Sequence, residues 1–318
     1  IRDSGFKLTI GHSRGSASSR GGGRIENLVR SAPPGAIGTV LRVTEQGQTL
    51  QQNYGLRPIA MRTLERTLYS LTQASAAGRN ASGELREDPR YLEVMQGIAD
   101  TSGKAYRLLV EQTDFYRYFR QVSPIDVIER MHIGSRTVAH AAARGGGGFA
   151  ALRTSSWVFA WVQNRIMLPE WYGMGTALQS VADRAGLPLL REMQAQWYFF
   201  ASIVEDLEAT LARADFDIAA FYNGLADAPL QKFFTLLRAE FDLTREWVLK
   251  IRDQQELLSA NPTLQRAILL RNPYVDPMNL MQVDLLKRWR QGGCEDPQLF
   301  AALLDSITGI AQGLQSTG

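Results

Sequence analysis

The helical spacing of apolar residues in the second half of the chain constrains the fold more than any other feature of the sequence. Four apolar residues within segment 201–214 follow the i, i+1, i+4, i+8 pattern of one buried helix face. They are Ile203, Val204, Leu207 and Leu211. The same period recurs near residues 229–257, so the region from residue 174 onward is predicted to be built from helices.

Capping residues predict where the last helices begin and end. Asp276 and Pro277 are predicted to start one helix, because Asp caps a helix N-terminus and Pro fits its first turn. A cluster of basic side chains before Gly292 suits a C-terminal helix dipole, and that glycine can end the helix. A second Asp-Pro pair, beginning at Asp296, predicts the start of the final helix.

Strand signals lie early in the chain. Segments 7–10 (KLTI) and 39–50 (TVLRVTEQGQTL) carry β-branched residues in partial alternation, and the breaker SAPPGAIG separates them. Helical spacing follows in residues 62–76, and a polar break is predicted at residues 82–90. Further helices are expected over residues 90–120.

Composition narrows the class of protein. With 318 residues and 45% hydrophobic content, the chain can bury a sizeable core as one large or two ordinary domains. No apolar run approaches the roughly 20 residues that span a bilayer, so a soluble protein is expected. The net charge of +3 disfavours general nucleic-acid binding. The chain begins at Ile1 without a methionine, and an earlier native start is expected.

Cysteine and histidine are too few for several kinds of site. The chain has one cysteine, Cys294, and three histidines without paired spacing. An internal disulfide is excluded, and a metal site built from Cys or His is disfavoured. This composition fits a reducing cytoplasm.

Two glycine-rich segments carry arginines. Residues 11–24 (GHSRGSASSRGGGR) contain three arginines, and the segment 134–153 is bracketed by Arg136 and Arg153. Glycine permits close backbone approach, and arginine offers a planar fork of donors to phosphate or carboxylate. One interpretation is that the two segments are loops whose arginines converge on an anion. The other interpretation, for residues 11–24, is a flexible linker or a nucleic-acid tail.

An aromatic run follows the second of these segments. The sequence WVFAWV is predicted to be core, because aromatic side chains are more often buried than used to bind ligands. The polar residues Gln163, Asn164 and Arg165 then interrupt the apolar run.

Six motifs, taken in order, resemble the C-terminal part of phosphoenolpyruvate carboxylase. They are Arg14 and Arg20 among glycines, LRVTEQG, GSR followed by LR, WVFAWVQNRIMLPEWYGMG, LLRNPYVDPMNLMQVDLLKR and IAQGLQSTG. The resemblance covers residues 1–318 and implies a mostly α-helical protein built around an eight-stranded (β/α)8 TIM-like barrel. Late barrel strands would lie at residues 7–10, 39–50 and 157–162, so the barrel would be incomplete in this chain.

The resemblance also implies how function is divided along the chain. Residues 1–173 would hold barrel strands and catalytic loops. Residues 174–318 would form a helical region with an allosteric site and the C-terminal tail.

The activity implied by the resemblance is carboxylation of phosphoenolpyruvate with bicarbonate, which gives oxaloacetate and phosphate. Arg136 and Arg153 would hold the phosphate. Arg20 would stabilise bicarbonate or carboxyphosphate, and Arg14 would belong to a loop that closes over the site. Arginine suits these anions because it stays protonated and binds them in a bidentate way. The cofactor would be Mg²⁺ or Mn²⁺, with its ligands outside this chain.

The sequence departs from the family pattern in both loops. Ser13, Ser16 and Ser19 replace three glycines of the family's Gly-Arg-Gly-Gly repeats, and HAAARGGGG is less basic than the family tends to be. The family's catalytic Thr-Ala-His-Pro motif does not occur, since none of the three histidines is followed by proline. The chain alone is therefore expected to be inactive and to need the N-terminal part of the enzyme as its partner.

An inhibitor site for aspartate or malate, remote from catalysis, is also implied. Arg42 and Arg271 match two of its arginines. Arg213 stands where the family has lysine, and Ser316 where it has asparagine. Inhibition is expected to be weaker, because these replacements change geometry and remove amide donors. The competing interpretation makes Arg213 and Arg271 solvated helix-end residues.

The sequence is compatible with two functions. One is the C-terminal part of a cytoplasmic, homo-oligomeric enzyme; the other is a non-catalytic regulatory or assembly protein derived from that enzyme. A preceding Thr-Ala-His-Pro motif with acidic metal ligands would favour the first. Neither nucleic acid nor a membrane is expected as a partner.

Overall fold

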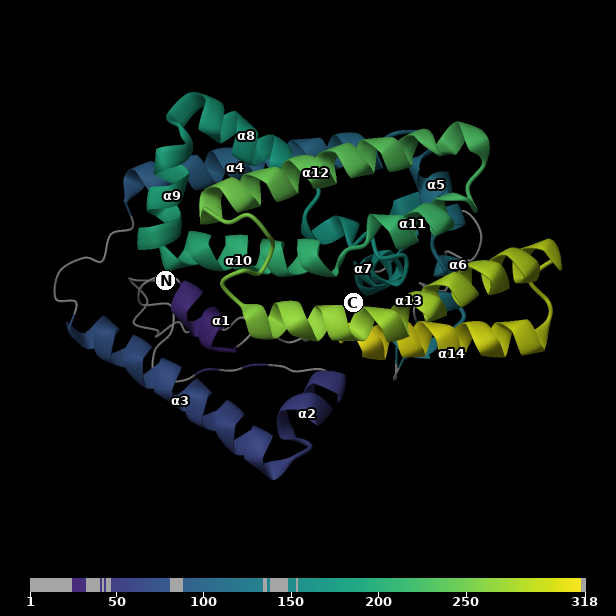
Figure 1. The fold of residues 1–318 in the computed structure, drawn as a ribbon, viewed down its shortest axis with the longest axis horizontal. Helices are drawn as coiled ribbons and strands as arrows, with labels where there is room; N and C mark the ends of the chain where they lie inside the picture. Colours follow the sequence, from purple (N-terminus) through teal and green to yellow (C-terminus); the bar gives the residue numbers. More distant parts are fainter. Residues whose placement is uncertain are drawn as a thin grey trace, which may run out of the picture. The chain divides into compact units, whose positions relative to one another are not determined.

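The chain forms two compact units that divide after residue 86. The computed structural model describes residues 25–32, 41, 43, 47–80, 88–133, 136–137, 148–152 and 154–315. Most of these residues are helical (Figure 1), which confirms the expected predominance of helix. The expected division between a catalytic part, residues 1–173, and a regulatory part, residues 174–318, does not coincide with the boundary after residue 86. It stays a prediction.

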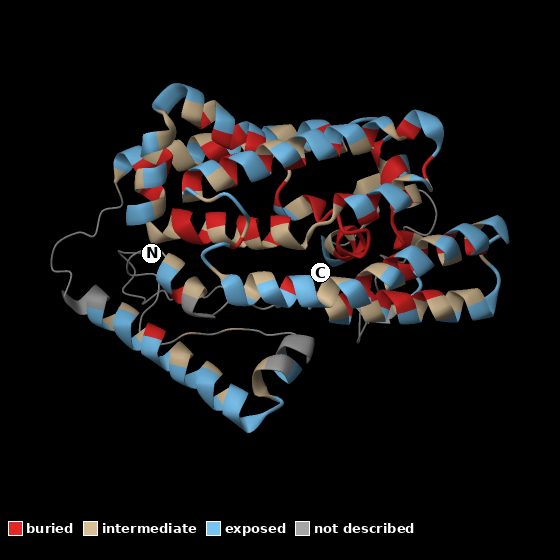
Figure 2. Cartoon of the chain, viewed as in Figure 1, coloured by how far each residue is buried: buried red, intermediate tan, exposed pale blue. Residues whose placement is uncertain are grey.

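The first unit contains α1 (Ile25–Ser31), α2 (Gly47–Tyr54) and α3 (Arg57–Asn80). Both shorter helices contact α3, which includes the helix predicted from the spacing in residues 62–76. Several apolar side chains of α3 are exposed, among them Met61, Leu64 and Leu68. Figure 2 accordingly shows α3 mostly in the colour of exposed residues.

The second unit is built mainly from helices. Its α-helices are α4 (Pro89–Val110), α5 (Phe115–Val122), α6 (Ile125–Ile128), α7 (Thr154–Gln163), α8 (Met174–Ala185), α9 (Leu187–Gln196), α10 (Tyr198–Arg213), α11 (Phe216–Asn223), α12 (Lys232–Arg252), α13 (Pro262–Gln291) and α14 (Pro297–Leu314). Its short elements are β1 (His132–Ile133), β2 (Arg136–Thr137) and the 3-10 helices η4 (Gly148–Ala151), η5 (Leu168–Glu170) and η6 (Ala228–Leu230). None of the helices in the described part of the chain is both long and apolar enough to cross a bilayer.

Helix pairs build the second unit. Helix α8 packs against α4 and α12, and α13 packs along α14. The predicted apolar stripe of α10 faces the core, with Val204, Leu207 and Leu211 buried and Ile203 partly buried. Asp296 caps α14 as predicted, because its side chain accepts hydrogen bonds from the backbone N–H groups of Gln298 and Leu299.

Aromatic side chains fill the centre of the second unit around α5 and α7. The ring of Phe115 lies 6.1 Å from that of Trp161 and 5.2 Å from that of Phe233, measured between centroids. Trp157 and Phe119 are 4.6 Å apart. The prediction that the WVFAWV run belongs to the core is therefore confirmed.

The same run corrects the expected strand at residues 157–162, because these residues belong to α7. A short apolar run cannot be assigned to a strand or a buried helix from its period alone. Helix α7 is buried on several sides, so it lacks the polar face that would have revealed a helical period. Figure 2 shows this helix mostly in the colour of buried residues.

The other two expected strands are at residues 39–50 and 7–10. Residues 47–50 of the expected strand 39–50 lie in α2, so that part was wrong. Segment 7–10 lies outside the described residues. Within the described residues, the strands are the two-residue pair β1 and β2, which form an antiparallel hairpin, and the expected barrel strands are not observed.

Helix α13 begins earlier than predicted. Asn261 caps it by accepting a hydrogen bond from the backbone N–H of Leu264, and Pro262 occupies its first turn. Pro273 and Pro277 lie inside the helix, which bends along its length in Figure 1. Asp276 is therefore an interior residue and not the predicted cap. The helix does end at Gly292, as expected.

Candidate functional site

Three arginines from separate segments meet beside α10 and α13. Arg165 lies in the turn after α7, Arg213 is the last residue of α10, and Arg271 lies within α13. Their charges interact, since both Arg213 and Arg165 lower the pKa of Arg271. We call these three residues the arginine cluster.

Arg165 is fully buried, and its guanidinium is satisfied by α13 and by the end of α10. Its Nη1 donates to Oδ1 of Asp276 at 2.7 Å, and its Nη2 donates to Oδ1 of Asn272 at 3.3 Å. Its Nε donates to the backbone carbonyl of Arg213 at 3.2 Å. That carbonyl belongs to the last turn of α10, whose C=O groups have no partner within the helix. A carboxylate of Asp215 lies 3.7 Å from Nη2.

Arg213 lies against η5. Its Nη2 is 3.8 Å from the carboxylate of Glu170, and its side chain is only 12% exposed. The Thr210 hydroxyl donates to the same carboxylate at 2.7 Å and accepts a hydrogen bond from Nη2 of Arg213 at 3.4 Å. Glu170 and Thr210 thus hold the Arg213 guanidinium in place.

Arg271 is the least compensated member of the arginine cluster. Its Nε is buried and has no hydrogen-bond partner among the residues that the structure describes. Burial lowers its pKa, and the nearby cations Arg213 and Arg165 lower it further. A lowered pKa means that the protonated form is disfavoured here, so an anion placed beside Arg271 would be stabilised.

The arginine cluster can therefore bind a small anion with carboxylate or phosphate groups. Arg165 is compensated by Asp276 and Asp215, and Arg213 by Glu170. Arg271 supplies an unused buried donor, and arginine binds planar oxyanions in a bidentate way.

The predicted site residues divide into two groups. Arg213 and Arg271 are brought together. Helix-end solvation does not describe Arg271, which lies inside α13 and is partly buried. The backbone of Arg136 lies in β2, but its side chain is not described. Arg14, Arg20, Arg42, Arg153 and Ser316 lie outside the described residues, so the predicted convergence of the loop arginines stays a prediction.

Sequence reasoning gave no role to Glu170 or Asn272. Their partners Thr210 and Arg165 are 40 and 107 residues away in the sequence, and of the residues in the arginine cluster's surroundings only the polar run Gln163, Asn164 and Arg165 stood out, because it interrupts an apolar segment.

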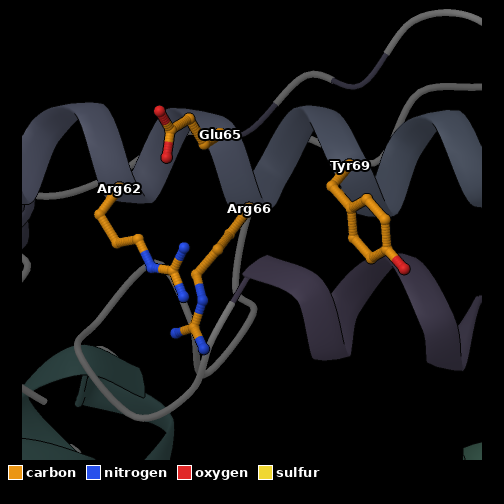
Figure 3. A pocket seen from close by; sticks show the side chains of 4 residues that line it. All are labelled: Arg62, Glu65, Arg66 and Tyr69. Carbon is orange, nitrogen blue, oxygen red and sulfur yellow. The ribbon is translucent and has the colours of Figure 1, made fainter.

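A second basic feature lies on α3. Figure 3 shows an open hollow lined by Arg62, Glu65, Arg66 and Tyr69, with both arginine side chains extending to one side of the helix. Its lining residues come from one helix face and are spaced three or four residues apart, as neighbours on a helix surface are.

Within the described ranges, no group of three or more His, Cys, Asp or Glu side chains is arranged to hold a metal ion. The described residues thus do not fit Mg²⁺ or Mn²⁺. The expectation that the ligands of this ion lie outside the chain stays a prediction.

The described residues form a helical protein with three arginines grouped among its packed helices. Comparison with known proteins then gives the family. The family model described as phosphoenolpyruvate carboxylase matches residues 1–318. The chain belongs to the phosphoenolpyruvate carboxylase family.

Curated relatives agree with the family model. The phosphoenolpyruvate carboxylase of Xanthomonas oryzae pv. oryzae (strain MAFF 311018) is 42% identical over 319 residues, covering 99% of this chain and 34% of the relative. The phosphoenolpyruvate carboxylase of Shewanella loihica (strain ATCC BAA-1088 / PV-4) is 37% identical, covering 98% of this chain and 35% of the relative. That of Nitrosomonas eutropha (strain DSM 101675 / C91 / Nm57) is 35% identical, covering 99% of this chain and 34% of the relative. The chain spans about a third of the length of these relatives and matches their C-terminal part.

Asp206 on α10 provides a pH test of the surroundings of Arg213. Burial raises its pKa to about 6, the carboxylates of Glu205 and Glu170 raise it, and Arg213 opposes the rise. The pKa of Asp206 in the folded protein lies above its unfolded value of 3.8, so the protonated carboxyl makes its full contribution to the free energy of unfolding below about pH 4. This contribution is lost as the pH rises through about 6.

We therefore expect Asp206→Asn to raise the free energy of unfolding relative to wild type more at pH 7 than at pH 4.5. Urea unfolding at both pH values measures this difference. Asp183→Asn, at an exposed position on α8, is the control and should change the free energy by less than about 0.5 kcal/mol. An equal effect of Asp206→Asn at the two pH values would contradict the expectation.

Proposed function

We propose that this chain is the C-terminal part of an enzyme that carboxylates phosphoenolpyruvate with bicarbonate to give oxaloacetate and phosphate. The observation that carries the proposal is the family match over the full length of the chain. In this reaction, bicarbonate attacks the phosphate group and forms carboxyphosphate and the enolate of pyruvate. Carboxyphosphate then releases carbon dioxide and phosphate, and the enolate captures the carbon dioxide.

The contribution of this chain to the chemistry is charge stabilisation. Arg136 and Arg153 hold the phosphate, and Arg20 stabilises bicarbonate or carboxyphosphate as negative charge develops. Arg14 lies on the loop that closes over the site and excludes water, which would otherwise protonate the enolate. The catalytic histidine, the metal ligands and the remaining barrel strands come from the preceding part of the protein.

The arginine cluster supports a regulatory role for the second unit. Arg213 and Arg271 bind the carboxylates of aspartate or malate, together with Arg42 and Ser316. The unused buried donor and lowered pKa of Arg271 favour an anionic ligand at this position. The complete enzyme acts in the cytoplasm as a homo-oligomer, a tetramer in this proposal, and supplies oxaloacetate to the tricarboxylic acid cycle.

The experiment joins this chain to the preceding two-thirds of the Xanthomonas oryzae relative and measures oxaloacetate from phosphoenolpyruvate, bicarbonate and Mg²⁺. We expect activity from the joined protein and none from either part alone, because the two parts supply different groups. Circular dichroism and size-exclusion chromatography verify that the joined protein is folded. A folded but inactive joined protein would favour the non-catalytic alternative, and activity of the chain alone would contradict the assigned division of residues.

A further inference from the structure

The end of α7 and the turn that follows it place three consecutive polar side chains in the core. Gln163, Asn164 and Arg165 are each fully buried, and each reaches a different part of the second unit. Gln163 donates through Nε2 to the carbonyl of Ile307 in α14 at 3.2 Å, and Asn164 donates to the carbonyl of Val122 at the end of α5 at 3.1 Å. We call these three residues the polar turn.

The backbone of the polar turn is held in an uncommon conformation. Arg165 has a φ of 63°, in the left-handed region that residues other than glycine seldom adopt. Met167, two residues later, has a φ of 53°. Such conformations persist when the surrounding contacts determine them, so the direction of the Arg165 side chain is fixed by the fold.

Arg165 connects the two arginines proposed to bind the inhibitor. Its Nε donates to the backbone carbonyl of Arg213, and its Nη2 donates to Asn272, the residue next to Arg271. The backbone carbonyl of Arg165 also accepts a hydrogen bond from the N–H of Asp215 at 2.9 Å. The relative position of Arg213 and Arg271 therefore depends on where Arg165 lies.

The polar turn also ties α13 to α7. Asn279 of α13 donates to the backbone carbonyl of Gln163 at 2.8 Å, and Gln282 donates to the side-chain oxygen of Gln163 at 3.2 Å. These bonds are buried, so breaking one would leave polar groups without partners in the core. A shift of α13 is therefore transmitted to the end of α7. At its other end, α7 begins at Thr154, directly after Arg153.

We propose that Arg165 is a positioning residue that couples anion binding at Arg213 and Arg271 to the position of α7, and through it to binding of phosphoenolpyruvate. This inference rests on the proposed function, because it assumes the regulatory pair and the role of Arg153. Arg165 touches neither ligand, and it acts by fixing the separation of α10, α13 and the end of α7.

The test uses the joined protein and measures the dissociation constant of L-malate by calorimetry, with and without phosphoenolpyruvate and in the absence of bicarbonate. The ratio of the two constants is the coupling between the sites, and by linkage it is the same for either ligand. We expect phosphoenolpyruvate to weaken malate binding about tenfold in the wild type. In Arg165→Gln and Asn272→Ala, the ratio should fall below about threefold.

Arg290→Gln is the matched control. Arg290 also lies on α13 and donates several hydrogen bonds, to Asp126 at 2.9 Å and to the backbone carbonyl of Ser123 at 2.7 Å among others, and none of these hydrogen bonds reaches the polar turn. Its loss should lower the melting temperature and leave the ratio at the wild-type value. If Arg165→Gln does not fold, Asn272→Ala alone tests the role of Arg165, because this variant leaves the Arg165–Asp276 pair intact.

The outcomes separate the two proposals. Absence of malate binding by the folded wild-type protein would overturn the proposed regulatory site itself. Malate binding with a wild-type ratio in both variants would overturn only the role of Arg165. The same conclusion would follow from a ratio near one in the wild type or from an equal loss of coupling in Arg290→Gln.

Discussion

Replacing Arg20 by alanine in the joined protein is expected to lower the kcat for oxaloacetate formation by about a hundredfold or more. The reason is that a fixed guanidinium would meet the charge of carboxyphosphate as it develops, and alanine offers nothing in its place. Arg20→Lys should retain part of the activity, because lysine keeps the charge but loses the planar fork of donors. Steady-state rates at saturating phosphoenolpyruvate and bicarbonate measure both effects.

Arg24 gives the matched control for this prediction. It lies in the same glycine-rich segment, four residues after Arg20, but it matches none of the arginines that the family resemblance implies. Arg24→Ala should therefore change kcat by less than about threefold, a barrier difference well under 1 kcal/mol. If Arg20→Ala retained more than a tenth of wild-type activity, or if Arg24→Ala were equally damaging, the assignment of Arg20 would be wrong.

Local sequence signals predicted the helices whose polar and apolar faces are distinct. The stripe containing Val204 and Leu207 identified α10, and the Asp-Pro pair at Asp296 located the start of α14. In both cases the residues that predict the helix lie within one or two turns of one another. The local sequence is therefore enough to predict the helix.

The wrong predictions for α7 and for the start of α13 have two different physical causes. Residues 157–162 of α7 are all apolar and show no period, so this run is as compatible with a buried strand as with a helix. For α13, the sequence holds two signals of the same kind, Asn261-Pro262 and Asp276-Pro277. The helix starts at the first and continues through the second, because packing against α14 and the contact with Arg165 support the bent interior.

The candidate site was predictable only in part. Arg213 and Arg271 were identified by resemblance, and the structure brings them together. The role of Arg165 depends on partners that are 48 to 111 residues away in the sequence. Its burial among them could not be predicted from the local pattern, which showed only a charge within an apolar run.

The second large effect is expected at Asp276. Arg165 is fully buried, whereas the side chain of Asp276 is 30% exposed, and the two are 2.7 Å apart. Removing the carboxylate by Asp276→Ala leaves a buried cation with only the more distant Asp215 as a carboxylate partner. Breaking a buried ion pair in this way typically costs 3–5 kcal/mol, and the partial exposure of Asp276 favours the lower end, about 3 kcal/mol.

Asp284→Ala on the same helix separates this effect from helix propensity. Asp284 pairs with Arg288 at 3.5 Å, and both side chains are more than half exposed, at 65% and 60%. Both substitutions exchange Asp for Ala inside α13, so the gain in helix propensity is the same and cancels in the comparison. Asp284→Ala should change the free energy of unfolding by no more than about 0.5 kcal/mol, because exposed pairs contribute little. Urea unfolding of the two variants measures the difference, which we expect to be at least 2 kcal/mol on the basis of these typical values. Equal stability of the two variants would mean that Asp276 does not compensate the charge of Arg165, and that Asp215 and Asn272 suffice to keep the guanidinium in the core.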